Sequence, residues 1–95
     1  TALAPASREQ LIRWLVANKT GDTRLRAGFP RDWRIGDKTG SGDHGTANDI
    51  AIAWPPGRKP VIVAVYLTET TVAPAARDAA IAAIGRTIAE MMASR

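Results

Sequence analysis

The sequence contains no cysteine, which excludes a disulfide framework and a thiolate metal site. It contains one histidine, His44, so a metal centre built from several histidines is excluded as well. The longest apolar run, residues 61–67, is far too short to cross a bilayer. We therefore predict no metal site and no membrane partner.

Aromatic residues are scarce, at 5% of the chain, and they do not alternate with basic residues as in a stacking platform for bases. Lysine and arginine number 13 against 9 acidic residues, which gives a formal net charge of +4. This surplus suits an anionic ligand, but the basic residues do not gather on one predicted face. The sequence therefore predicts no nucleic-acid partner.

The length of 95 residues, with 45% apolar residues, predicts at most one small domain with its own core. A chain of this size buries only about 60 to 65% of its unfolded surface, so its stability without a partner would be marginal.

A helix is predicted near each end of the chain. The first spans residues 8–19, where Ser7 and Gln10 have the form of a capping box and Trp14 belongs to an apolar stripe expected in the core. The second begins at Pro74, and the alanines within it permit close packing. Its apolar stripe consists of Ile81, Ile84, Ile88 and Met91.

Three strands are predicted between the helices, at residues 33–39, 46–54 and 61–67, after a loop at 21–32. Their short connections indicate an antiparallel three-stranded meander flanked by helices, an α/β protein of the α+β sandwich type. The third strand is apolar at nearly every position, so we expect it to be buried on both faces. The helix at 8–19 does not obviously cover the second face, and part of the fold is expected to lie outside this chain.

The stretch Lys38-Thr39-Gly40-Ser41-Gly42 ends the first predicted strand and carries the chemistry. The lysine is a fixed cation, the threonine hydroxyl can share an anionic ligand with it, and the glycines let a ligand lie against the backbone. The N–H groups of the last three residues, predicted to be free of a partner strand, can stabilise an oxyanion. A plain hairpin turn with a solvated lysine is the alternative from these residues alone.

Residues 40–45 also match the dinucleotide-binding pattern G-x-G-x-x-G. That pattern requires a helix after the third glycine, and a strand is predicted there, so we reject it. His44 is predicted to be a solvated loop residue, and Asp49 a buried hydrogen-bonding anchor. The single loop histidine gives no convincing Ser/His/Asp triad.

Residues 33–43, 45–51 and 54–55 resemble the C-terminal part of a class A serine β-lactamase, and residues 11–28 resemble the same family in register. The resemblance implies that residues 1–95 are the C-terminal segment of a single α/β domain of the β-lactamase/transpeptidase-like fold, with the N-terminal part as partner. The family's Ser-x-x-Lys and Ser-Asp-Asn motifs are absent. This segment alone therefore lacks the nucleophile and should be inactive.

The resemblance implies an enzyme that hydrolyses the β-lactam ring of penicillins and cephalosporins through an acyl-enzyme, without a cofactor. Lys38 and Thr39 would bind the substrate carboxylate, and Gly40 would line the same site. Ser41 would give its N–H to the oxyanion hole and its hydroxyl to that carboxylate.

Many members of the family place an arginine after the turn, where this chain has Ala47. Others supply the positive charge from the loop before the strand, at the position of Arg24. The resemblance thus favours Arg24 over Arg26, a choice that composition alone leaves open.

Two alternatives remain: a segment of a penicillin-binding DD-peptidase, and a small α/β module that binds an anion without chemistry. A periplasmic or secreted location follows from the resemblance only. In isolation the segment should aggregate or remain poorly folded, because the strand at 61–67 would be exposed.

Overall fold

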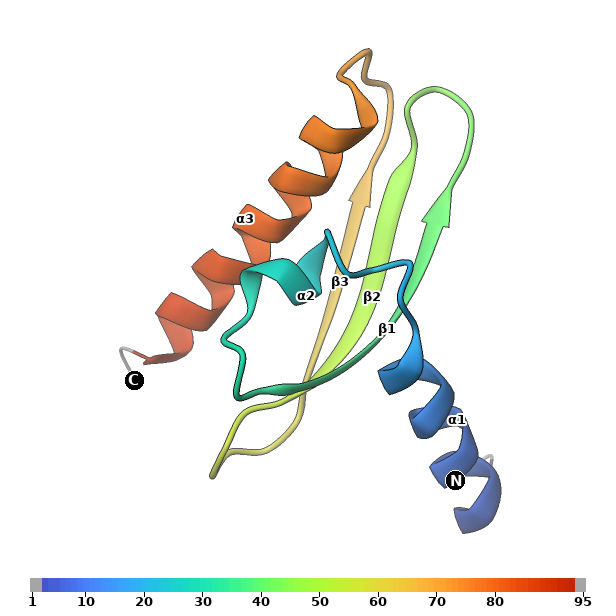
Figure 1. The fold of residues 1–95 in the computed structure, drawn as a ribbon, viewed down its shortest axis with the longest axis vertical. Coiled ribbons are helices and arrows are strands. Elements are labelled where there is room, and N and C mark those ends of the chain that lie inside the picture. Colours follow the sequence, from blue (N-terminus) through green and yellow to red (C-terminus); the bar gives the residue numbers. More distant parts are fainter. Residues whose placement is uncertain (1–2, 94–95) are drawn as a thin grey trace.

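The computed structural model describes residues 3–93, so positions 1–2 and 94–95 of the predicted segment lie outside the described residues. Three strands form one antiparallel sheet in the order β1-β2-β3, with helices beside it (Figure 1). The elements are α1 (Pro5–Ala17), α2 (Leu25–Gly28), β1 (Arg34–Ser41), β2 (Ala47–Trp54), β3 (Val61–Leu67) and α3 (Pro74–Ala93). The predicted meander flanked by helices is confirmed, and the predicted loop at 21–32 contains the short helix α2.

One face of the sheet is covered by α2 and α3 (Figure 1). Alternate residues of a strand point to opposite faces, and the register sets Ile35 opposite Ala53 and Asp37 opposite Ala51 on this covered face. The core that forms there consists of Leu25, Phe29, Ile35, Ala47, Ala51, Ala53, Val63, Ile81 and Ala89.

The other face of the sheet is largely open. Ile50 is 42% exposed, Ile62 73% and Tyr66 69%. Helix α1 reaches this side only at its end, where a Cβ on Gly36 would lie 3.0 Å from Cβ of Leu15. The expectation that the third strand is buried on both faces is therefore wrong for residues 3–93, since its outward apolar side chains have no covering layer there.

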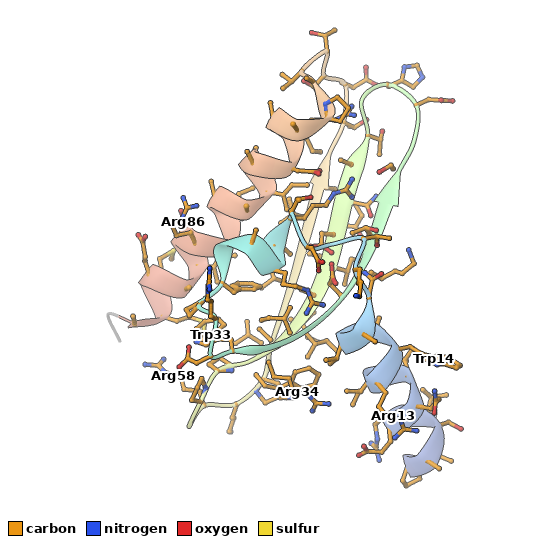
Figure 2. All side chains as sticks on the ribbon, in the orientation of Figure 1. Arg13, Trp14, Trp33, Arg34, Arg58 and Arg86 are labelled. Carbon is orange, nitrogen blue, oxygen red and sulfur yellow. The ribbon has the colours of Figure 1, made fainter. Side chains whose placement is uncertain are left out.

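Helix α1 begins earlier than predicted, with Pro5 in its first turn and Ala4 as N-cap. No side chain caps this end, so the predicted capping box at Ser7 is wrong, because Ser7 already lies inside the helix. No residue of α1 is buried, and Trp14 is 64% exposed and points away from the sheet (Figure 2). The expectation of Trp14 in the core fails because no described element packs on that side of the helix.

Helix α3 packs through small residues rather than through its whole isoleucine stripe. Ile81 is fully buried, but Ile84 is 42% and Met91 56% exposed, contrary to prediction. A Cβ on Gly85 would lie 2.8 Å from the Leu25 carbonyl oxygen, and a Cβ on Gly28 would overlap the Ala82 carbonyl oxygen. The backbones of α2 and α3 are therefore in direct contact, and this contact fixes the loop that precedes α2.

The substitution Gly28→Ala is expected to lower the free energy of unfolding by about 1–3 kcal/mol, since it overpacks the contact between the two helices. Gly42→Ala is the matched control, because its Cβ would lie 3.9 Å from Thr46 Cβ, an ordinary contact. The control is expected to change that free energy by less than about 0.5 kcal/mol. Urea unfolding of the complete protein carrying either substitution measures the difference, and equal losses in the two variants would contradict the close approach of α2 and α3.

Candidate functional site

Strand β1 is an edge strand, and it continues through Gly40 to Ser41 before the turn begins. The Gly42 N–H donates to the Thr46 carbonyl at 3.1 Å. Because N–H groups alternate in direction along an antiparallel strand, the Gly40 N–H also points to β2, while the Ser41 N–H points to the open edge. The prediction that all three N–H groups are free is therefore wrong, and Ser41 alone of the three presents its N–H there.

The side chain of Lys38 lies on the opposite face of β1 from Thr39 and Ser41, because strand side chains alternate. It is exposed, and its Nζ donates to the Thr39 carbonyl oxygen at 2.5 Å. The ammonium group and the two hydroxyls therefore flank the edge of the strand from its two sides. A ligand at this edge can meet both.

Arg24 is buried, at 9% exposure, and its guanidinium reaches the end of β1. Nη1 donates to the carbonyl oxygens of Gly40 at 3.0 Å and Asn48 at 2.7 Å. Nη2 donates to Ser41 Oγ at 2.9 Å, and Nε to Asp78 Oδ1 at 2.9 Å. These four bonds use four of the five N–H donors of an arginine, and one Nη2 hydrogen is left for a ligand.

Arg26 turns away from the site. Its Nη2 donates to Asp37 Oδ1 at 3.0 Å, and its Nε lies 3.7 Å from Asp22 Oδ1. Ala47 is 1% exposed and pairs with Ser41, on the face of the sheet where Arg24 meets Ser41. The structure thus brings Arg24 and not Arg26 to the strand end, beside the small residue at position 47.

The hydroxyl of Thr39 is already engaged. Asn18 Nδ2 donates to the Asp37 carbonyl oxygen at 3.1 Å, which leaves Asn18 Oδ1 to accept the Thr20 hydroxyl at 3.0 Å. Thr20 Oγ1 and Thr39 Oγ1 lie 2.6 Å apart, and the single hydroxyl proton of Thr20 is used, so Thr39 donates this bond. Thr39 therefore offers a ligand lone pairs, not a proton.

The hydroxyl of Ser41 has the opposite polarity. Its oxygen accepts from Arg24 Nη2, so its own proton is free to be donated. The donors that remain available to an anion are thus the Ser41 hydroxyl, the last Nη2 hydrogen of Arg24 and the Lys38 ammonium group. Sequence reasoning missed Asn18, Thr20 and Asp78, because their roles depend on contacts between segments far apart in the chain.

Two fully buried carboxyl groups, Asp37 and Asp49, lie behind the site. Arg26 donates to Asp37 Oδ1, and the Leu25 N–H donates to Asp49 Oδ2 at 3.1 Å. The remaining oxygens, Asp37 Oδ2 and Asp49 Oδ1, are buried and have no donor among the described residues. A single proton held between the two carboxyl groups satisfies both, which is consistent with a hydrogen bond between these side chains.

Burial, then the hydrogen bond and the charge of Asp37, raise the pKa of Asp49 from 3.8 to about 8. The Leu25 N–H and the charge of Arg24 act in the opposite direction but do not outweigh burial. Asp49 therefore carries the shared proton at neutral pH. The prediction of a buried hydrogen-bonding anchor at this position is confirmed.

His44 is exposed in the turn between β1 and β2, with a φ of 61°. Strand β2, not a helix, follows Gly45, which confirms the rejection of the dinucleotide pattern. Among residues 3–93 no group of three acidic, histidine or cysteine side chains is placed to hold a metal ion. Nor does any helix in that range have the length and apolar character to span a bilayer.

A family model described as "Beta-lactamase enzyme family" matches residues 1–92. A beta-lactamase of Streptomyces fradiae is 49% identical over 90 residues, which are 95% of this chain and 29% of that protein. Beta-lactamase AST-1 of Nocardia asteroides is 57% identical over 68 residues, 72% of this chain and 22% of that protein. The chain thus spans less than a third of either relative.

Among solved structures, an ancestral (GNCA) class A beta-lactamase is 68% identical with a TM-score of 0.92, and the match covers 95% of this chain and 35% of that one. A class A beta-lactamase described as the last common ancestor of Gram-negative bacteria (GNCA4) is 62% identical with a TM-score of 0.94, over 97% of this chain and 35% of that one.

The proton held by Asp49 predicts a pH dependence of stability. The folded state keeps this proton up to pH about 8, whereas an unfolded aspartate releases it near 3.8, so the stability it contributes is lost as pH rises between these values. In Asp49→Asn the amide oxygen still accepts the Leu25 N–H and the NH₂ group donates to Asp37 permanently. We expect this variant to lack that loss.

Urea unfolding of the complete protein at several pH values in this range measures how the free energy of unfolding changes with pH. Asp32→Asn, at an exposed position, is the control and should keep the slope of the parent protein. An unchanged slope in Asp49→Asn would contradict the shared proton.

Proposed function

Because this chain belongs to the beta-lactamase enzyme family, as a segment of a class A serine β-lactamase, we propose that the complete protein hydrolyses the β-lactam ring. The observation that carries the proposal is the Ser41 N–H directed to the open edge of β1, between a cation and a donor hydroxyl. Residues 1–95 are proposed to be the C-terminal segment of one domain whose remainder supplies the nucleophile.

In the proposed mechanism a serine of the remainder attacks the lactam carbonyl, and the Ser41 N–H donates to the oxygen that becomes negatively charged. The C–N bond of the lactam ring then breaks, the nitrogen keeps the electron pair and takes up a proton, and water hydrolyses the resulting acyl-enzyme ester. A preorganised donor of this kind contributes about 10²–10³ in kcat. Ser41 suits the role because an edge strand holds the N–H fixed without giving it to a neighbouring strand.

The substrate carboxylate is proposed to accept from the Ser41 hydroxyl and from the last Nη2 hydrogen of Arg24, with the Lys38 ammonium nearby. Hydrogen bonds to a charged group contribute about 1.5–3 kcal/mol each. Thr39 now donates its hydroxyl proton to Thr20, so it can donate to the carboxylate only if its hydroxyl rotates away from Thr20. A Cβ at Gly40 would lie 2.6 Å from Asn48 Oδ1, so any larger residue there would displace the Asn48 side chain.

Two curated relatives that are 49% and 57% identical are named beta-lactamases, which favours a hydrolase over a DD-peptidase or an anion-binding module. We extend the proposal to a periplasmic or secreted location, the typical setting of this family. The buried guanidinium of Arg24 also supports a site for an anion, because four of its five N–H donors are paired within the chain and the fifth, on Nη2, still requires an acceptor.

Hydrolysis of a chromogenic cephalosporin by the complete protein tests the proposal, with Ser41 variants as the discriminating pair. Ser41→Pro removes the N–H at an edge position where proline is tolerated, and should lower kcat about 10²- to 10³-fold. Ser41→Ala keeps the N–H and loses the hydroxyl, so it should raise KM with kcat nearly unchanged. Equal kcat values in the two variants would show that the Ser41 N–H does not contribute to the oxyanion hole.

Arg24→Ala in the complete enzyme should raise KM for a penicillin about tenfold or more, since it removes a donor to the carboxylate and the bond that orients Ser41. Arg31→Ala is the control, because Arg31 is exposed in the same loop and lines a different hollow of the surface. An unchanged KM in the Arg24 variant would show that Arg24 does not bind the substrate carboxylate.

A further inference from the structure

The buried carboxyl groups of Asp37 and Asp49 lie close to the strand end that carries the proposed site. Asp49 is opposite Thr39 across β1 and β2, two residues from the rung that Ser41 forms with Ala47. At a rise of about 3.4 Å per residue the two rungs are about 7 Å apart, and side chains two residues apart on a strand share one face of the sheet. The pair therefore lies beside the residue whose N–H is proposed for the oxyanion hole.

One proton joins the two strands through this pair. Asp37 Oδ2 and Asp49 Oδ1 are buried without a donor among the described residues, so each needs the other carboxyl group as its partner. With Asp49 protonated, its O–H donates to Asp37 and links β2 to β1. Once the proton is released to solvent, two buried carboxylates face each other without a donor between them and repel.

On the side of Asp37 the neighbouring charge is already shared. Asp37 Oδ1 accepts from Arg26 Nη2 of α2 at 3.0 Å and from Asn18 Nδ2, at the end of α1, at 3.2 Å. Arg26 also faces Asp22, whose Oδ1 lies 3.7 Å from its Nε and whose side chain is 58% exposed. Part of the Arg26 charge therefore acts on Asp22 and not on the pair.

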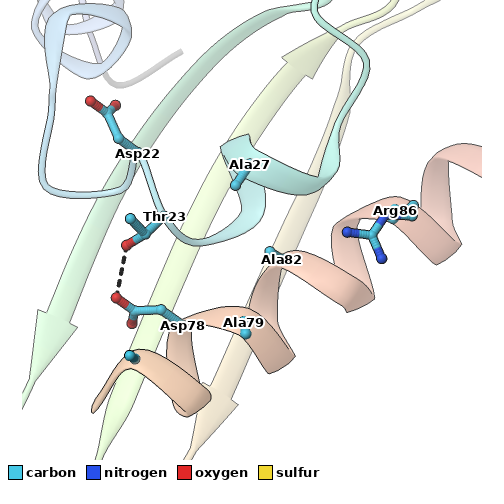
Figure 3. A pocket seen from close by; sticks show the side chains of 8 residues that line it. Asp22, Thr23, Ala27, Asp78, Ala79, Ala82 and Arg86 are labelled. Atoms are coloured by element: carbon cyan, nitrogen blue, oxygen red, sulfur yellow. Dashed lines mark hydrogen bonds between the residues drawn. The ribbon is translucent and has the colours of Figure 1, made fainter.

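On the side of Asp49 the neighbours are mostly neutral or already paired. The Leu25 N–H donates to Asp49 Oδ2, and Val65 is the residue opposite on β3. The charge of Arg24 favours ionised Asp49, but its Nε donates to Asp78 of α3 (Figure 3). Burial, followed by the hydrogen bond and charge of the other carboxyl group, outweighs these contacts and raises the pKa of Asp49 to about 8.

Strand β1 is the element that this repulsion would displace. It is an edge strand, and within residues 3–93 it pairs with β2 alone. Two like charges between the strands would move Asp37, and with it the segment of β1 that leads to Ser41. A displacement of about 1 Å in a group that acts on the substrate can lower the rate about 10²-fold.

We propose that Asp37 and Asp49 are positioning residues with a pH limit built in: their shared proton holds β1 against β2 beside Ser41, and release of that proton sets the alkaline limit of β-lactam hydrolysis. The inference rests on the proposed function of this site. It predicts that a group which no substrate touches determines where the activity falls as pH rises.

The experiment records kcat/KM of the complete enzyme for a chromogenic cephalosporin from about pH 6 to about pH 10, with each profile normalised to its own plateau. The parent should lose activity as pH rises through about 8. Asp49→Asn should move this loss upward by at least about one pH unit, because its amide donates to Asp37 without a titrating proton. Circular dichroism of the parent should stay unchanged where the activity falls.

A second variant moves the limit in the opposite direction and leaves the buried pair intact. Asp22→Asn removes the negative charge beside Arg26, whose charge then acts more fully on the pair and favours its ionised form. The alkaline loss should therefore shift downward by about 0.2–0.5 of a pH unit. Glu90→Gln is the matched control, since it removes one negative charge from an exposed position of α3 and should shift nothing.

The proton itself has a signal that does not depend on activity. The infrared difference spectrum of the parent between about pH 6 and about pH 10 should show the loss of a carbonyl band of a protonated carboxylic acid, and Asp49→Asn should lack this band. If the proposed function fails, the parent hydrolyses no β-lactam at any pH while this band is still present.

Three results would overturn the inference. The first is an alkaline loss at the same pH in the parent and in Asp49→Asn, even if the variant melts at a lower temperature. The second is an alkaline loss that coincides with unfolding by circular dichroism. The third is a shift in Asp22→Asn no larger than that in Glu90→Gln, a result that remains decisive if Asp49→Asn does not fold.

Discussion

A buried guanidinium must find an acceptor for nearly every N–H it carries, and this requirement of Arg24 organises the structure. Its partners come from α3, β1 and β2, which are Asp78, Gly40, Ser41 and Asn48. These four bonds, which join α3 and the loop before α2 to the sheet, leave one Nη2 hydrogen of Arg24 unused. The hydrogen bonds of Arg24 that stabilise the fold therefore also orient the groups of the proposed site.

A second polar layer lies beneath the first. The shared proton of Asp37 and Asp49 joins β1 to β2, while Arg26 and the Leu25 N–H join α2 to both carboxyl groups. Gly21 is required above it, because a Cβ there would overlap the Asp37 carboxylate. This layer holds the loop on either side of Arg24, so the position of the guanidinium depends on carboxyl groups that no substrate reaches.

The sequence was enough to predict the three strands, the meander and the final helix, because period-two and helical patterns are local properties. It failed for Trp14 and for the outer face of β3, whose burial requires partners outside residues 3–93. The Lys-Thr-Gly-Ser motif identified Lys38 and Ser41 as candidate site residues. No local sequence pattern identifies Asp78, because it lies 54 residues from its partner Arg24. Whether Thr39 donates or accepts its hydrogen bond likewise cannot be predicted without knowing where Thr20 lies in the fold.

The open edge of β1 also affects how this chain can pair with other extended chains. Unpaired N–H and C=O groups on an edge strand are a template for another extended chain, and proteins normally protect such edges. In the proposed function, a substrate whose carbonyl accepts the Ser41 N–H would bind beside β1 as a further strand does, through a single hydrogen bond. The edge that would make this chain prone to wrong strand pairing is thus also the edge proposed to recognise the substrate.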